Sequence, residues 1–139
     1  MTHPGGSTSG LLTDGVLRVA GNFTSWSSGG ENFAATGNHR TILDGTAAQT
    51  IDTYFNGAGQ SRFWDLEIQN VAGVAMVRNL RVSNDFDIAA SFTVNAGLTA
   101  TVSGTFTLQV AGTLNNSGTV TAAACSLLGT VNGTAPICP

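Results

Sequence analysis

Apolar residues recur two positions apart in short runs that are separated by turn-forming residues. The regularity is clearest when three consecutive segments of equal length, 63–82, 83–102 and 103–122, are aligned without a gap. The aligned apolar columns are Leu66, Phe86 and Phe106; Ile68, Ile88 and Leu108; Val74, Val94 and Leu114; Leu80, Ala100 and Val120; and Val82, Val102 and Ala122. A spacing of two predicts β-strands, because a helix would repeat its apolar positions at intervals of three and four.

Polar residues occupy the columns between the apolar ones. These columns are Asp65, Asp85 and Thr105; Glu67, Asp87 and Thr107; Asn79, Thr99 and Thr119; and Arg81, Thr101 and Thr121. Equal segments with matching columns are typical of a solenoid, in which each coil hydrogen-bonds to the next at about 4.8 Å. The pattern therefore predicts an all-β, single-domain parallel β-solenoid, or β-helix, with coils of about 20 residues. A β-sandwich is the alternative, although its strands seldom repeat at a constant interval.

The N-terminal half of the chain repeats less regularly. Residues 17–23 match residues 80–86, a separation close to three coils with a few inserted residues. The segment between them contains three predicted strands, at 33–36, 40–43 and 49–55. We interpret residues 24–62 as wider coils whose loops bulge outward, and insertions of this kind often form the binding face of a repeat protein.

We expect three parts along the chain. Residues 1–10, rich in glycine, serine and threonine, are expected to be a flexible lead-in, 11–124 the solenoid domain, and 125–139 a C-terminal capping tail. The placement of Cys125 and Cys138 favours a disulfide of the kind found in secreted proteins. Such a bond would fold the tail across the last coil, whose strand edges are otherwise unpaired. Two unpaired thiols are the alternative.

The composition limits the classes of partner. Charged residues make up 9% of the chain, whereas about 25% is usual in a globular protein. Lysine is absent, and five arginines against eight carboxylates give a net charge of −3. Binding to nucleic acid or to an anionic membrane surface requires clustered positive charge, so we expect neither partner. No stretch approaches the ~20 apolar residues of a membrane span, so membrane insertion is not expected either.

Several stretches resemble repeat modules of large bacterial surface proteins. They are residues 17–23, which end in Gly-Asn-Phe, residues 34–41 (Ala-Ala-Thr-Gly-Asn-His-Arg-Thr) and residues 44–51 (Asp-Gly-Thr-Ala-Ala-Gln-Thr-Ile). Residues 63–70 are similar to the F-x-N-L-x-I-x-N rung of adhesin-like, right-handed β-helices, although Asp65 stands at the usual asparagine position. The resemblance covers residues 17–115 and implies a cell-surface or secreted solenoid. Its motifs specify the fold, so it assigns no functional residue.

Four carboxylates would stack on one outward face in this register, with Asp65 beside Asp85 and Glu67 beside Asp87. Unit charges about 5 Å apart repel by roughly 1 kcal/mol in water, and directly opposed like charges are normally avoided on sheets. A bound cation such as Ca²⁺ would remove the repulsion, which makes these residues a candidate cation-binding site. The alternatives are a neighbouring arginine, of which Arg62 is nearest in sequence, and four solvated side chains that splay apart.

Paired carboxylates are also the catalytic groups of glycoside hydrolases, so a fragment of a polysaccharide-active β-helix protein is a further alternative. Enzymes of that type have many more coils and typically place basic side chains near the acids. His3 and His39 lie elsewhere in the sequence, and neither has a partner at metal-ligand spacing. We expect His39 in a loop or at a strand end. We therefore expect a protein that is not an enzyme, and we assign no catalytic residue and no firm cofactor.

Trp26 is the best candidate for contact with a glycan. It lies among serines and glycines, and an exposed indole ring can stack on a sugar ring. Trp64 has the same parity as Leu66 and is expected to point into the core. The threonine columns suit outward strand positions without any ligand, because threonine is a favourable strand residue.

The expected function is that of a non-catalytic structural and adhesive module, located outside the cell or on its surface. Because the ends of a solenoid are open sheet edges, we expect self-association end to end or contact with neighbouring repeats of a larger surface protein. A glycan-binding module that uses Trp26 and the loops of residues 24–62 is the alternative.

Overall fold

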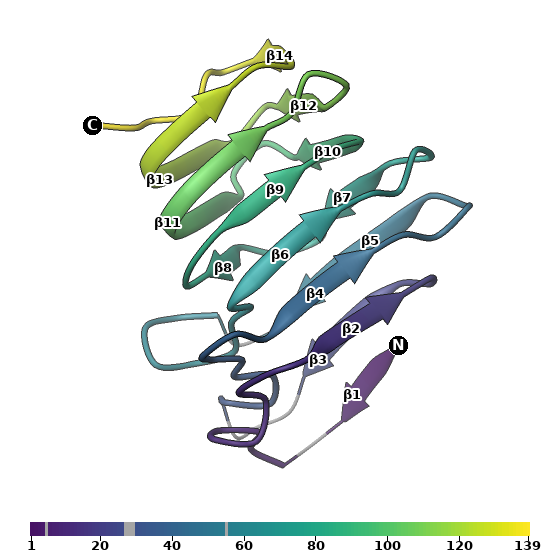
Figure 1. The fold of residues 1–139 in the computed structure, drawn as a ribbon, viewed down its shortest axis with the longest axis vertical. Coiled ribbons are helices and arrows are strands. Elements are labelled where there is room, and N and C mark those ends of the chain that lie inside the picture. Colours follow the sequence, from purple (N-terminus) through teal and green to yellow (C-terminus); the bar gives the residue numbers. More distant parts are fainter. Residues whose placement is uncertain (5, 27–29, 55) are drawn as a thin grey trace.

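In the computed structural model the chain winds into a stack of parallel rungs that runs from the N-terminus to the C-terminus (Figure 1). The structure describes residues 1–4, 6–26, 30–54 and 56–139. These residues form strands, turns and bends, and none of them is helical. The arrangement confirms the prediction of an all-β parallel β-solenoid with coils of about 20 residues.

The stack has two large parallel sheets of seven strands each, which we call sheet A and sheet B. Sheet A contains, in spatial order, β1 (Thr2–Pro4), β3 (Phe23–Trp26), β5 (Gln49–Thr53), β7 (Val74–Met76), β10 (Ser91–Val94), β12 (Thr113–Asn116) and β14 (Thr130–Gly133). Sheet B contains β2 (Val16–Val19), β4 (Arg40–Leu43), β6 (Asp65–Ile68), β9 (Phe86–Ile88), β11 (Thr99–Leu108) and β13 (Thr119–Leu127), together with β8 (Leu80–Val82). In Figure 1 most of sheet B lies in front of sheet A.

Each coil also has a short third side between its sheet A strand and its sheet B strand. β8 pairs with the first part of β11, and that part of β11 pairs in turn with the first part of β13. After the third side, β11 and β13 bend at the corner and continue along the face of sheet B that contains β9. Their register shifts at this corner, between Val102 and Thr105. Isolated bridges such as Ala34–Arg62 extend the third side toward the N-terminus. The cross-section is therefore three-sided, and its interior is lined by one side of each strand from β2 to β13.

The inward columns of sheet B and of the third side are those that the sequence predicts. The confirmed columns are Leu66, Phe86 and Phe106; Ile68, Ile88 and Leu108; Leu80, Ala100 and Val120; and Val82, Val102 and Ala122. All of these side chains are buried in one continuous core. The rings of Phe86 and Phe106 meet edge to face, with their centroids 5.6 Å apart. Successive coils therefore contact each other through the core as well as through backbone hydrogen bonds.

One predicted column, on sheet A, is wrong. Val74 and Leu114 align with Phe92, whereas Val94 aligns with Asn116. Phe92 is fully buried and its ring packs against that of Phe86, with the centroids 5.0 Å apart. The gap-free alignment is therefore displaced by two residues on this side of the coil.

The displacement arises because the turns at the corners differ in length. The turn from sheet B to sheet A spans only residues 89–90 in this coil, whereas its neighbours span 69–73 and 109–112. The turn at the next corner is correspondingly longer, so the interval of 20 residues is restored on sheet B. Close packing limits these turns: a Cβ on Gly112 would lie 2.3 Å from the carbonyl oxygen of Ile88.

The N-terminal coils are wider, as predicted. The paired residues Phe23 and Ile51 are 28 positions apart, and β4 and β5 confirm two of the three predicted strands. The third, at 33–36, is not a strand, although Ala34 forms a single bridge to the next coil. The match between residues 17–23 and 80–86 is not a structural equivalence, because the first runs from sheet B to sheet A and the second from the third side to sheet B.

The first residues, expected to be a flexible lead-in, include strand β1, which pairs with β3. Thr8 is buried, and its hydroxyl oxygen accepts a hydrogen bond from the backbone N–H of Ala34 at 2.8 Å. The backbone N–H of Thr8 also donates to the carbonyl of Glu31, at 3.0 Å, so Thr8 contacts the loop of the next coil through both its side chain and its backbone.

The C-terminal tail lies along the third side of the last coil. Ile137 forms a parallel bridge with Thr121, and backbone hydrogen bonds join it to Val120 and Ala122. Cys125 and Cys138 form a disulfide, with their Cα atoms 5.9 Å apart. The tail thus occupies the place of the next rung beside the first part of β13.

Candidate functional site

The register of β6 and β9 stacks the carboxylates in two columns on the outer face of sheet B, with Glu67 directly beside Asp87. Asp65 Oδ1 accepts hydrogen bonds from Asn84 Nδ2 at 2.7 Å and from the backbone N–H of Asp85 at 3.3 Å. Asp85 Oδ1 accepts in turn from the backbone N–H of Thr105, at 2.9 Å. These two carboxylates therefore each bind a backbone donor of the following coil.

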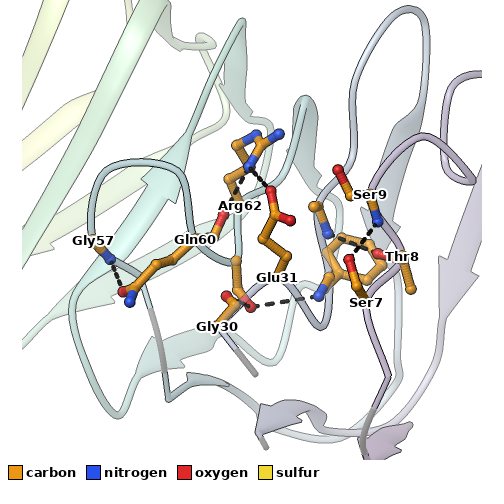
Figure 2. Close-up of polar contacts among 11 residues, drawn as sticks. Ser7, Thr8, Ser9, Gly30, Glu31, Gly57, Gln60 and Arg62 are labelled. Atoms are coloured by element: carbon orange, nitrogen blue, oxygen red, sulfur yellow. Dashed lines mark hydrogen bonds and ion pairs between the residues drawn. The ribbon is translucent and has the colours of Figure 1, made fainter. Parts of the chain in front are cut away.

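Glu67 has protein partners of its own. Its carboxylate lies 3.6 Å from a guanidinium nitrogen of Arg40, on β4, and accepts a hydrogen bond from Gln69 Nε2 at 2.5 Å. The arginine beside the carboxylate stack is therefore Arg40. Arg62, the nearest in sequence, pairs instead with Glu31 at 3.8 Å (Figure 2).

The surroundings of Asp87 in the carboxylate stack shift its pKa. Burial raises its pKa above the ordinary value of 3.8, and the charges of Glu67 and Asp85 raise it further. A hydrogen bond with Thr107 and the charge of Arg40 act in the opposite direction. Two of these causes follow directly from the register, because Glu67 and Thr107 are the direct neighbours of Asp87 on β6 and β11.

Calcium binding by Asp65, Glu67, Asp85 and Asp87 remains a prediction. The described residues contain no group of three or more histidine, cysteine or acidic side chains arranged to hold a metal ion. Arg40 and the backbone donors described for these carboxylates lower their mutual repulsion without a cation.

His39 lies at the strand end predicted for it, immediately before β4. It is 4% exposed, its ring packs edge to face on Phe33, and its Nδ1 atom has no hydrogen-bond partner. Burial lowers its pKa below 6.5, and the negative charge of Asp65 only partly opposes this. His39 is thus a neutral core residue at neutral pH.

Hydrogen bonds and an ion pair tie together the loops of the wide coils, which the sequence suggests as a binding face (Figure 2). Arg62 donates a hydrogen bond to the carbonyl of Gln60 at 2.9 Å, and the side chain of Gln60 accepts one from the Gly57 backbone at 2.8 Å. Ser61 is buried and donates to the carbonyl of Gly30 at 3.2 Å. These contacts fix residues 30–34 and 57–62 against the stack, while residues 27–29 and 55 lie outside the described part.

Trp26 is exposed, as predicted, and it lies beside residues for which the sequence predicts no functional role. Its ring centroid lies 6.2 Å from that of Tyr54, which is also exposed. The guanidinium carbon of Arg78 lies 4.2 Å from the centre of the Tyr54 ring, and Arg78 forms an ion pair with Asp52. We call Trp26, Tyr54, Arg78 and Asp52 the aromatic platform.

Strand alternation could have identified part of this platform. Ile51 and Thr53 are buried, so Asp52 and Tyr54 point outward, and the same rule applies to Trp26 on β3. The sequence does not predict which of these residues lie opposite one another, because loops of irregular length separate β3, β5 and β7.

Trp64 does not occupy the core position predicted for it. Phe63 is fully buried at the corner between the third side and sheet B, whereas Trp64 is partly buried and packs against the edge of the core. The corner interrupts strand alternation, so parity counted back from Leu66 does not extend to Trp64.

A shallow hollow of about 250 Å³ lies at the corner between sheets B and A. It is lined by Val71, Ala89, Ala90, Ser91, Ala111 and Thr113. The lining residues come from the two-residue turn 89–90, from the start of the strand that follows it, and from the corresponding corners of the coils on either side. None of its lining side chains is ionisable, so it offers no acid or base.

Searches against protein-family models, curated proteins and solved structures find no match to this chain. Among the described residues, no helix is long and apolar enough to cross a membrane.

Proposed function

We propose that this chain is a non-catalytic structural and adhesive module of an extracellular or cell-surface protein. The observation that carries the proposal is the unbroken stack of parallel rungs over one continuous core. Because every coil packs on the next through buried side chains, the stack has a fixed length and resists bending. A rigid prism of this kind is suited to holding distance and displaying surface groups.

The disulfide supports an extracellular or cell-surface location. Cys125 and Cys138 are joined, and structural disulfides persist mainly in oxidising compartments. The likeness of several stretches to adhesin-like β-helices of bacterial surface proteins points in the same direction.

The carboxylate stack gives little support to the alternative of a polysaccharide-active enzyme. Asp65 and Asp85 accept hydrogen bonds from backbone donors, and Glu67 is paired with Arg40. A general acid and a base must face a substrate bond from two sides, whereas these carboxylates lie in columns on one sheet face. A reducing-sugar assay with a panel of polysaccharides tests this, and any release of reducing ends would overturn the non-catalytic assignment.

The last coil supports self-association or contact with a neighbouring repeat. Beyond β14 and the second part of β13, the described residues contain no further strand on sheets A and B. Leu128 is 65% exposed at this end, and Leu127 and Ile137 are exposed as well. No side chain after Asp87 carries a charge at neutral pH. Proteins commonly protect open edges with charged side chains, so an uncharged apolar edge favours pairing with another chain.

Sedimentation equilibrium of the purified chain over a range of concentrations tests the self-association. We expect the average mass to rise with concentration, and we expect Leu128→Asp to remain monomeric because it places a charge on the open end. Val71→Asp is the matched control, since Val71 is 87% exposed but lies at a corner in the middle of the stack. A wild-type chain that stays monomeric throughout, or a Val71→Asp variant that loses association equally, contradicts the proposed end-to-end contact.

A further inference from the structure

The two rings of the aromatic platform do not contribute to the core. Trp26 is 54% exposed and Tyr54 is 49% exposed, on the outer face of the wide coils at the ends of their sheet A strands. The core beneath β3 and β5 is already filled by Phe23 and Ile51. Single exposed apolar residues are normal on a protein surface, whereas exposed apolar groups that lie together often mark a site for a ligand or partner. The position of the two rings therefore indicates that they serve contact with a ligand or partner and not the stability of the core.

Arg78 is held in place from two sides. Its guanidinium lies over the Tyr54 ring and is paired with Asp52, whose hydrogen bond with Arg78 raises the pKa of the guanidinium. A guanidinium has five N–H donors, and the bond to Asp52 uses the Nη1 nitrogen. Further donors of Arg78 and further acceptor capacity on Asp52 thus lie next to the Tyr54 ring, already oriented.

We propose that the aromatic platform binds a neutral glycan, with a pyranose ring stacked on Trp26 and other hydroxyl groups of the same glycan hydrogen-bonded to Arg78 and Asp52 on the far side of Tyr54. The C–H bonds on one face of a pyranose carry a small positive charge, and the face of an indole ring is negative. Each sugar hydroxyl both donates and accepts a hydrogen bond, which matches a donor and an acceptor held side by side. Binding requires no large rearrangement, because the ion pair orients both groups in advance.

The charge of the platform selects among ligands with a flat face. Arg78 and Asp52 cancel, so the platform offers no net positive charge to hold the carboxylate of an acidic sugar, whereas a neutral sugar needs none. Bases of single-stranded nucleic acid also stack on aromatic rings, but their binding depends on a positively charged groove. This chain has no lysine and a net charge of −3.

Glycan binding by the platform would supply the ligand class for the proposed adhesive function, and the inference rests on that part of the proposed function. It does not depend on self-association, because the platform lies on the side of the N-terminal coils and the open edge lies at the C-terminal end. Glycan binding and the mass in solution are separate measurements, so either one can fail alone.

Intrinsic fluorescence gives a direct test, since the chain has only two tryptophans. Trp64→Phe keeps a ring at the partly buried site and leaves Trp26 as the single indole reporter. This variant is titrated to millimolar concentration with cellohexaose, xylohexaose, mannohexaose and N-acetylchitohexaose, and separately with a galacturonate hexamer and a single-stranded DNA oligonucleotide. We expect saturable changes in Trp26 emission with at least one neutral hexasaccharide and none with the two anionic probes.

Calorimetry with the bound hexasaccharide then tests the residues in the otherwise unmodified chain. We expect Trp26→Ala and Arg78→Ala to weaken binding by about tenfold or more, and Val110→Ala, at an exposed corner far from the platform, to leave it unchanged. Trp26→Phe and Arg78→Lys are included in case an alanine variant fails to fold, and each is expected to retain part of the affinity. The proposal is overturned if no neutral hexasaccharide binds in either measurement, if binding survives loss of Trp26, or if only an anionic probe binds.

Discussion

The side chains of Glu67 and Asp87 lie side by side on the outer face of sheet B, because β6 and β9 pair in parallel with these residues as direct partners. Like charges at directly opposed positions destabilise a sheet. Asp87 is also partly buried, and burial is the main cause of its raised pKa. The local register thus imposes an unfavourable interaction that one substitution can remove.

We expect Asp87→Asn to increase the free energy of unfolding at pH 7 by about 0.5–1 kcal/mol, the scale of a cross-strand like-charge pair. An amide of the same shape removes the repulsion with Glu67 and keeps an acceptor for the hydroxyl of Thr107. Urea unfolding measures the change, and Asp14→Asn, at an exposed bend, is the control with the same chemical replacement.

The gain from Asp87→Asn should depend on pH with a defined sign. A raised pKa means that the folded chain binds a proton at Asp87 more readily than the unfolded chain does. Stability from this residue therefore falls as pH rises from about 3.8 through the pKa of the folded state. The advantage of the variant should be largest near pH 7 and should diminish toward acidic pH, and an advantage that is constant with pH contradicts a raised pKa of Asp87 in the folded chain.

Calcium should have little effect on the stack if the protein donors suffice. Asp65 and Asp85 accept backbone hydrogen bonds, and Glu67 is paired with Arg40. We expect the melting temperature at millimolar calcium to equal that at the same ionic strength of sodium chloride. A rise specific to calcium that Asp85→Asn abolishes would instead establish the cation site.

Val94→Asp should unfold the chain, because Val94 is fully buried and a carboxylate there has no partner. The expected loss exceeds about 4 kcal/mol, beyond the usual effect of a single substitution. Thr93→Asp is the matched control, since Thr93 lies next to Val94 on β10 with its side chain on the outer face. Circular dichroism and thermal melting distinguish the two, and equal destabilisation by both would contradict the assigned orientation.

His39 should make the chain less stable in mild acid. Its pKa in the folded state is lowered, so the unfolded chain takes up the proton first as pH falls. Its contribution is fully present above the ordinary pKa of 6.5 and is lost as pH falls below that value toward the folded pKa. Urea unfolding at pH 8 and pH 5.5 should show a smaller decrease for His39→Phe than for the wild type, with His3 common to both.

Reduction of the disulfide should release the tail. For two cysteines 13 positions apart, chain entropy predicts a loss of about 3 kcal/mol. Hydrogen exchange adds a local readout, because the backbone N–H of Ala122 bonds to the carbonyl of Ile137. We expect Cys125→Ser with Cys138→Ser to speed exchange at Ala122 far more than at Leu66, within the middle of the stack. Equal acceleration at both amides would indicate global unfolding instead.

Strand alternation in the sequence determined the fold class and the core of the regular coils. On sheet B, equal spacing places Leu66, Phe86 and Phe106 in one column, and the structure has them so. The information is local, because inward and outward positions alternate along any strand and a constant interval fixes which strands are neighbours.

Only the tertiary structure decided where turns of unequal length displace that register. Phe92 rather than Val94 lies between Val74 and Leu114, because the turn at one corner of this coil is short and the turn at its next corner is long. The interval in sequence stays the same while one side of the coil moves by two residues, so alignment alone cannot detect the change.

The aromatic platform could be predicted from the sequence even less than the column of Phe92. The sequence marked Trp26 as a surface ring, but the approach of Tyr54, Arg78 and Asp52 depends on loops whose lengths follow no repeat. Which side of a strand a residue faces is set by its nearest neighbours in the chain. Which residue lies opposite it on the next coil is set by all the turns between them, and only the folded chain determines their combined length.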